Sequence, residues 1–173
     1  KRIEGQAWSE LIGPDGVKTS ELDRHMDILR QVANAVHYAH SKGVMHRDLK
    51  PDNVMIGAFG EVYVLDWGIA LAFDGEHEGL PSAREVRHVA GTPRYMAPEM
   101  ACADGATFGP ATDVYLLGAI LFEVLTGSPP HAGETITEIM QAAYTSKPAT
   151  FEAHVDAGFA AIATRAMARE QTA

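Results

Sequence analysis

The chain has 173 residues, of which 46% are hydrophobic and 21% charged, and its formal net charge at pH 7 is −9. This composition is typical of one globular domain and unlike that of a disordered chain. The acidic balance argues against a nucleic-acid partner, because proteins that bind phosphate backbones usually present a basic face.

The first elements along the chain are helical. Residues 5–12 are expected to form a short helix that ends at the Gly-Pro-Asp-Gly stretch 13–16. A longer helix is predicted over residues 21–42, with Ser20 as its N-cap and Gly43 just after its end. Its apolar stripe recurs at spacings of three and four residues: Leu22, Met26, Leu29, Ala33, Val36 and His40.

Short β signals follow. Residues 54–56 and 62–65 flank a Gly-Ala-Phe-Gly turn and predict a hairpin. Residues 69–91 have no periodicity and predict a long loop, a kind of segment that is usually functional or mobile. After this loop, further helical segments are expected near residues 99–103, 113–125, 136–144 and 159–168. The fold class indicated is mainly α with a small β-hairpin.

Four sequence blocks carry the functional signal: His46-Arg47-Asp48-Leu49-Lys50-Pro51-Asp52-Asn53, Asp66-Trp67-Gly68, the segment 91–99 ending in Ala-Pro-Glu, and Asp113 to Gly118. In order and spacing they resemble the H-R-D-L-K-P-x-N, D-F-G, A-P-E and D-x-W-x-x-G blocks of eukaryotic-type (Hanks-type) serine/threonine protein kinases. The resemblance covers essentially the whole chain. The D-W-G variant is similar to that of bacterial members, and Trp67 is expected to pack in the hydrophobic slot of the usual Phe.

The resemblance implies transfer of the ATP γ-phosphoryl group to Ser/Thr hydroxyls of protein substrates, with ATP and Mg²⁺ as cofactors. Asp48 corresponds to the catalytic base and Lys50 to the cation that meets the phosphate, while Asn53 and Asp66 correspond to the metal ligands. Phosphoryl transfer needs positioning and charge neutralisation, and Mg²⁺ prefers one or two protein oxygens plus phosphates. Taken singly, each of these residues is compatible with an ordinary turn; the ordered set of blocks is not.

Other positions acquire roles through the same resemblance. Lys50 indicates Ser/Thr rather than Tyr specificity, and Thr92 resembles the threonine that contacts the catalytic Asp and Lys and helps select the substrate hydroxyl. His46 and Asp113 are expected to be structural, with Asp113 holding the backbone of the catalytic loop. The pattern is that of an intact catalytic loop.

The chain departs from the family by what it lacks. It contains no G-x-G-x-x-G stretch and no counterpart of the lysine–glutamate pair of the N-terminal lobe. Residues 1–173 are therefore expected to be the C-terminal lobe only, starting near the interlobe hinge and ending before the last helices. The missing N-lobe is expected in cis in a longer protein. The isolated chain is expected to be inactive, because ATP would lose most of its contacts.

Regulation is expected to involve Arg47, which in the family pairs with a phosphorylated residue of the activation loop. Ser82 is the one hydroxyl side chain between Gly68 and Gly91 and is therefore a candidate phosphosite. The alternative is that loop carboxylates supply the negative charge without modification, and these are Asp74, Glu76, Glu78 and Glu85.

Two other functions are compatible with parts of the pattern: a non-catalytic pseudokinase scaffold and a small-molecule phosphotransferase. The intact Asp48 and Asn53 argue against the first, and Arg47 and Lys50 against the second. Cys102 is the single cysteine, which excludes an intrachain disulfide and suits a cytoplasmic location. No apolar stretch approaches the ~20 residues that span a bilayer, so no membrane insertion is expected within these residues, and an anchor elsewhere in a longer protein is compatible with this.

Overall fold

The computed structural model describes residues 4–73, 77, 79–147 and 149–169. The helices of this part of the chain are α1 (Leu22–His40), α2 (Pro98–Ala101), α3 (Pro110–Thr126), α4 (Ile136–Thr145) and α5 (Ala157–Ala166). Its strands are β1 (Gly5–Ala7), β2 (Val44–Met45), β3 (Val54–Gly57), β4 (Val62–Val64) and β5 (Leu71–Ala72). The prediction of a mainly α architecture with a small hairpin is confirmed.

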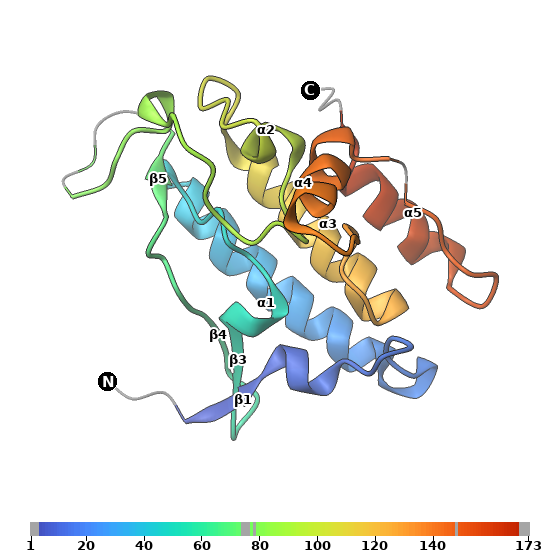
Figure 1. Cartoon of the computed structure of the whole chain (residues 1–173). Coiled ribbons are helices and arrows are strands. Elements are labelled where there is room, and N and C mark those ends of the chain that lie inside the picture. The colour runs from blue at the N-terminus through green and yellow to red at the C-terminus, as the bar shows by residue number, and fades with distance from the viewer. Residues whose placement is uncertain (1–3, 74–76, 78, 148, 170–173) are drawn as a thin grey trace.

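Helix α3 forms the centre of the molecule. It packs against α1 and α5, and Figure 1 shows it between them. Ala119, Ile120 and Val124 on this helix are completely buried, as its apolar sequence requires. Pro110 occupies the first turn, and Gly127 ends the helix in the left-handed conformation at φ 78°. The expected helix at 113–125 is thus confirmed and begins three residues earlier.

The small sheet contains one strand that was not expected. Strands β3 and β4 form the antiparallel hairpin, and β1 pairs with the other edge of β3, with Gly5 opposite Gly57. The prediction of a helix over residues 5–12 is therefore wrong for residues 5–7, and only Trp8–Leu11 makes a short 3-10 turn. The unpaired backbone groups at the edge of β3 offer hydrogen bonds that local sequence preference does not reveal.

Helix α1 confirms the predicted long helix, with a difference at its start. A 3-10 turn at Thr19–Glu21 precedes it, so Ser20 lies inside that turn and is not the N-cap. Gly43 follows the helix at φ 72°, as expected for the residue that ends it. The helices expected near 136–144 and 159–168 are confirmed as α4 and α5, and the short turn near 99–103 is α2.

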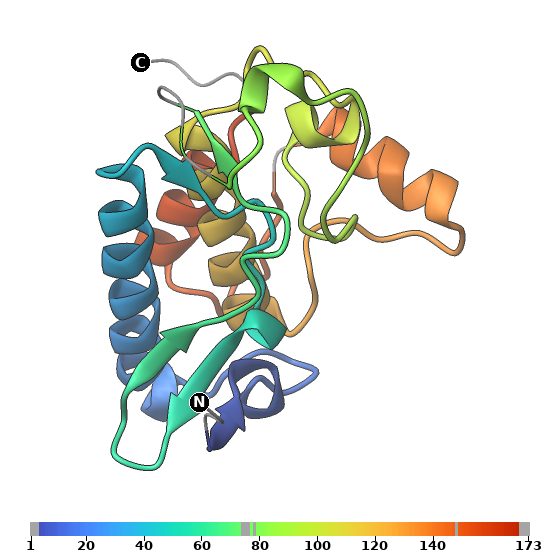
Figure 2. The same ribbon diagram turned by 90° about the vertical axis from the view of Figure 1, so that its left-hand side faces the viewer.

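The long loop is more regular than expected. Strand β5 lies within it and pairs antiparallel with β2, with Met45 opposite Leu71. A 3-10 turn at Ala83–Glu85 follows, and a bridge joins Ser82 to Ala72. The pairing of β5 with β2 brings this loop beside the start of the 46–53 loop, in the upper part of Figure 2. In the part of the chain that is described, no helix is long and apolar enough to cross a bilayer.

Candidate active site

The loop between β2 and β3, residues 46–53, is hydrogen-bonded to one buried carboxylate. Asp113 on α3 is completely buried. Its Oδ2 accepts the backbone N–H of His46 at 2.9 Å, and its Oδ1 accepts that of Arg47 at 2.9 Å. The Nε2 atom of His40 on α1 lies 2.7 Å from Oδ2. Arg47 has φ 69°, a strained value for a residue with a side chain. The bonds to Asp113 hold the backbone in this strained turn.

The carboxylate of Asp48 lies at the centre of a polar cluster. Its Oδ1 accepts the hydroxyl of Thr92 at 2.7 Å. Its Oδ2 lies 3.3 Å from the Lys50 ammonium and accepts Nδ2 of Asn53 at 3.0 Å. Lys50 also donates to the Thr92 hydroxyl at 2.7 Å. The side chains of Asp48 and Lys50 are only 14% and 20% exposed, so this cluster is screened from bulk water and its charges interact strongly.

Thr92 reaches this cluster from the far end of the long loop. The preceding residue, Gly91, has φ 114°, and a Cβ there would lie 3.1 Å from the Arg47 carbonyl oxygen and 2.8 Å from a methyl carbon of Met100. Only glycine allows this close approach. The glycine therefore lets the segment 91–92 lie directly against the 46–53 loop and brings together hydroxyl and carboxylate groups 44 residues apart.

The backbone pairing of the hairpin places Asn53 beside the residue that precedes Asp66. The backbone N–H of Leu65 donates to the Asn53 carbonyl at 2.8 Å, so Asp66 directly follows the residue paired with Asn53. Asn53 directs its Nδ2 to the Asp48 carbonyl at 2.7 Å and to the Asp48 carboxylate, which leaves its amide oxygen as an acceptor. Asp66 has φ 58° and is exposed, and its Oδ1 accepts the Gly68 N–H at 3.3 Å.

These two oxygen donors fit a magnesium ion that is bound mainly through phosphates and water. Mg²⁺ usually takes one or two protein ligands in such sites and does not need a dedicated cage. The described residues contain no cluster of three or more His, Cys, Asp or Glu that could hold a metal on its own.

The aromatic residue of the Asp66-Trp67-Gly68 block is less buried than expected. Trp67 is 37% exposed, its ring packs against His46 with centroids 4.5 Å apart, and its Nε1 donates to the Val64 carbonyl at 3.1 Å. The expected hydrophobic slot is thus only half formed around it. His46 is completely buried, and its ring nitrogens bond the Leu65 carbonyl at 2.9 Å and the Asp48 N–H at 3.1 Å. This is the structural position expected for His46.

Arg47 is buried with unused hydrogen-bonding capacity. It is 3% exposed, and its Nη1 donates to the Ile69 carbonyl at 3.2 Å while its guanidinium lies over the Phe108 ring at 5.0 Å. Its Nε and Nη2 atoms are buried without a hydrogen-bond partner among the described residues. Burial lowers the pKa of Arg47, and the opposing effect of Asp113 is smaller. A buried cation with free donors favours an anion nearby.

A cavity of about 470 Å³ opens beside Arg47 and is also lined by Ser82 and Glu85. Ser82 is half-buried at the start of the Ala83–Glu85 turn, and Glu85 is exposed. The other expected acidic residues, Asp74, Glu76 and Glu78, lie outside the described residues.

Sequence reasoning missed several partners of this site. His40 was assigned only to the apolar stripe of α1, yet its ring contacts Asp113. Tyr95 donates its hydroxyl to Glu123 at 2.6 Å, and burial is the main cause that raises the pKa of both groups. No local signal identifies these contacts, because they join residues 28 and 73 positions apart.

Comparison with known proteins finds one family model and several named relatives that agree with one another. The model of the protein kinase domain family matches residues 4–167. The serine/threonine-protein kinase PknD of Protochlamydia amoebophila is 45% identical over 125 residues, which is 65% of this chain and 12% of that protein. PknD of Chlamydia felis is 32% identical over 167 residues, covering 89% of this chain and 18% of the relative. PknB of Mycobacterium tuberculosis is 35% identical over 133 residues, covering 77% and 20% respectively. The chain thus spans no more than about a fifth of the length of these relatives.

Proposed function

This chain belongs to the protein kinase domain family, and on that basis we propose that it provides the phosphoryl-transfer residues of a serine/threonine protein kinase. The observation that carries the proposal is the Asp48 cluster, in which a carboxylate, an ammonium and a hydroxyl lie within 3.3 Å of one another. The relatives that cover most of the chain are named serine/threonine kinases, which agrees with this substrate class.

In the proposed reaction Asp48 orients the substrate hydroxyl and receives its proton as the new P–O bond forms and ADP leaves. Oδ1 of Asp48 already accepts the Thr92 hydroxyl, so the incoming hydroxyl uses a remaining lone pair of the carboxylate. Lys50 would stabilise negative charge on the transferring group, and Asn53 and Asp66 would hold the magnesium ion through their oxygens. Mg²⁺-ATP, when bound, supplies the phosphoryl group and part of the charge neutralisation.

Thr92 supports Ser/Thr specificity in this proposal. Its hydroxyl bridges Lys50 and Asp48, so it fixes the distance between the catalytic loop and the segment that follows residue 91. A short aliphatic hydroxyl of Ser or Thr reaches Asp48 across this distance, whereas a phenol needs a wider gap. A threonine in this position therefore positions the substrate as well as the base.

We further propose that residues 1–173 correspond to the C-terminal lobe and act with an N-terminal lobe in cis. The catalytic-loop, magnesium and Ala-Pro-Glu blocks are present, whereas no glycine-rich phosphate loop occurs in the sequence. ATP would bind this chain alone only weakly, so we expect negligible turnover by it. Because the reaction consumes ATP, we place the domain in the cytoplasm.

The experiment compares the longer parent protein with the chain 1–173, using Mg²⁺-ATP and matched peptides that carry Ser, Thr or Tyr. We expect the parent to phosphorylate the Ser and Thr peptides, and Asp48→Asn to lower its kcat by about 100-fold or more. Asp27→Asn, at an exposed position of α1, is the matched control and should leave kcat unchanged. Phosphate on tyrosine alone would overturn the specificity, and robust turnover by the isolated chain would overturn the lobe assignment.

The same assay separates the two other functions. A pseudokinase scaffold predicts no transfer by the parent and no effect of Asp48→Asn. A small-molecule phosphotransferase predicts transfer to an aminoglycoside or choline in preference to peptides. Neither result is expected: a scaffold would leave the Asp48 cluster without a role, and a small-molecule phosphotransferase would use Asp48 but leave the Lys50–Thr92 contact without one.

For regulation we propose that phosphoserine at position 82 supplies an anion to Arg47. The support is the shared cavity and the two unpartnered guanidinium nitrogens of Arg47. Glu85 lines the same cavity and is the unmodified alternative. Phosphosite mapping of the active parent should detect Ser82, and Ser82→Ala should lower activity while Glu85→Gln does not. Full activity with Ser82 unmodified would remove this reading.

A further inference from the structure

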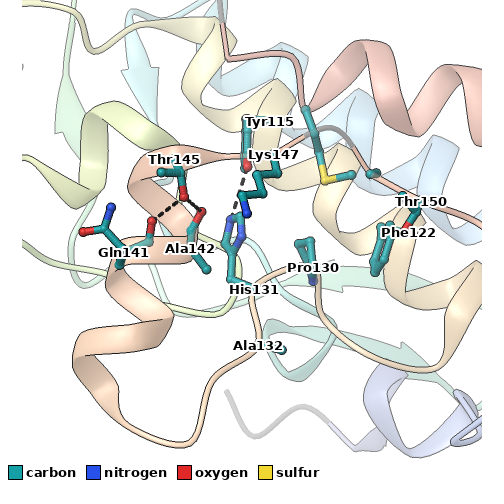
Figure 3. Close-up of a pocket in the computed structure, with 12 residues that line it drawn as sticks. Tyr115, Phe122, Pro130, His131, Ala132, Gln141, Ala142, Thr145, Lys147 and Thr150 are labelled. Atoms are coloured by element: carbon teal, nitrogen blue, oxygen red, sulfur yellow. Dashed lines mark hydrogen bonds between the residues drawn. The ribbon is translucent and has the colours of Figure 1, made fainter.

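A second cavity, of about 460 Å³, lies outside the Asp48 cluster. It is formed by α3, α4, the segments before and after α4, and the end of α5, and none of the residues that line it belongs to the Asp48 cluster or to the Arg47 cavity. Figure 3 shows its lining side chains converging from these separate elements. Its volume falls in the range of pockets that hold small organic ligands, roughly 300–1,000 Å³.

The cavity is lined by both apolar and polar side chains. Phe122, Pro130 and Met167 are apolar, whereas Gln141, Thr145 and Thr150 are polar. The floor carries Tyr115 and His131, which are buried. The Tyr115 hydroxyl lies 3.2 Å from Nε2 of His131 and 2.6 Å from Oγ of Ser146, and Nε2 of His131 also lies 3.0 Å from the Met96 carbonyl. The hydrogen bonds of the floor are therefore satisfied without a ligand and keep it rigid.

The charge of the cavity comes from one residue. Among the described residues that line it, Lys147 is the only one that is positively charged at neutral pH, and no Asp or Glu lines it. Burial is the main cause that lowers the pKa of His131, so its imidazole is neutral. Burial is also the main cause that raises the pKa of Tyr115 to about 12, so its phenol is neutral as well. In Figure 3 the Lys147 side chain extends into the cavity towards His131.

We propose that this cavity binds a small amphipathic carboxylate of the fatty-acid type. The carboxylate pairs with the Lys147 ammonium, and the alkyl chain lies along Phe122, Pro130 and Met167. A cationic ligand would find no carboxylate to pair with, and a neutral apolar ligand would leave the ammonium unused. Charge complementarity therefore selects an anion among ligands with an apolar body.

The test uses the chain 1–173 with ¹³C-labelled methionine methyl groups and octanoate as the probe. We expect the Met167 methyl signal to shift on titration, while those of Met26 on α1 and Met55 on β3 stay unchanged. Octanol and octylammonium have the same alkyl chain with neutral and positive head groups. We expect octanoate to bind more tightly than octanol, and octylammonium to bind least.

Two variants make the test specific. Lys147→Met should weaken octanoate about 3- to 5-fold, the range of a partly exposed ion pair, and leave octanol unchanged. Lys18→Met, at another exposed lysine away from the cavity, is the matched control and should bind like the original chain. Ala142→Leu places a larger side chain in the cavity and should abolish the Met167 shift with octanoate and octanol alike.

Three results would overturn the proposal. The first is an unchanged Met167 signal at saturating octanoate, and the second is equal affinity of Lys147→Met and Lys18→Met for octanoate. The third is binding by the chain 1–173 that disappears in the longer parent, because the cavity is then covered by the protein itself. The lysine pair keeps the test decisive even if Ala142→Leu does not fold. Since the readout is binding, its outcome is independent of whether the chain transfers phosphate.

Discussion

Replacing Asp113 by Asn removes a buried charge and changes little else. The carboxylate is completely buried and accepts three donors: the backbone N–H groups of His46 and Arg47 at 2.9 Å and the ring nitrogen of His40 at 2.7 Å. An amide has one oxygen and one NH₂ group. In either orientation, its NH₂ group faces at least one backbone N–H that has no alternative acceptor.

The expected cost follows from these contacts. A buried backbone N–H left without an acceptor costs roughly 1–3 kcal/mol, and the remaining bonds lose the strength that the ionised acceptor gave them. The sum is about 3 kcal/mol of unfolding free energy, which is a large share of the 5–15 kcal/mol typical of a domain. For a chain of this size the melting temperature should fall by about 6–12 °C.

Urea unfolding followed by far-UV circular dichroism at pH 7 measures this change. The matched control is Asp27→Asn, because Asp27 is 68% exposed and forms a surface ion pair with Arg30 at 3.2 Å. That control should lie within about 0.5 kcal/mol of the original chain. If Asp113→Asn also changed the unfolding free energy by less than 1 kcal/mol, the inference that this carboxylate holds the catalytic loop would be refuted.

Three further measurements by urea unfolding test other parts of the fold. Nδ1 of His25 accepts the buried indole N–H of Trp8 at 2.9 Å, and burial is the main cause that lowers the pKa of His25. The contribution of His25 to stability should therefore be complete above its ordinary pKa of 6.5 and be lost as the pH falls below that value. In His25→Gln this loss of stability at low pH should be smaller. Gly127→Ala should lower the unfolding free energy by about 2 kcal/mol or more, because φ is 78° and the new Cβ would meet the backbone carbonyl of Pro14. The control Gly60→Ala has φ 85° and no neighbour within 4 Å, so it should lower the unfolding free energy by only about 1 kcal/mol. Tyr95→Phe should cost about 1–2 kcal/mol, because it removes the hydroxyl that donates to half-buried Glu123 at 2.6 Å; no change would show that water replaces this bond.

Most of the regular elements could be predicted because they depend on local patterns. Both long helices form where the apolar stripe of α1 and the apolar run of α3 predict them. On α1 the stripe was misplaced: the buried residues are His25, Ile28, Val32 and Val36, and only Val36 belongs to the predicted stripe. The β3–β4 hairpin was predictable from two β-rich segments around a glycine-containing turn. Strand β1 was not, because residues 5–7 become a strand only when the edge of β3 lies beside them.

The contacts of the candidate site likewise include some that were predictable from the sequence and some that were not. Asp48, Lys50 and Asn53 lie within six residues of one loop, so their proximity follows from the sequence alone. The contact of Thr92 with Asp48 and Lys50 was expected only through family resemblance, and it depends on the close approach that Gly91 allows. The contact of His40 with Asp113 had no signal at all, since a histidine on an apolar stripe resembles any other buried residue.

The amino-acid sequence by itself determined the helical class, the hairpin and the family motifs to which the proposed phosphoryl-transfer residues belong, because periodicity and short motifs act over a few neighbouring residues. Tertiary structure alone decided that Asp113 binds the loop backbone, that two nitrogens of Arg47 stay without a partner, and that Lys147 borders a cavity. The physical reason is that the partner of a buried polar group is chosen by how whole elements pack, and residues 70 positions apart carry no local record of that choice.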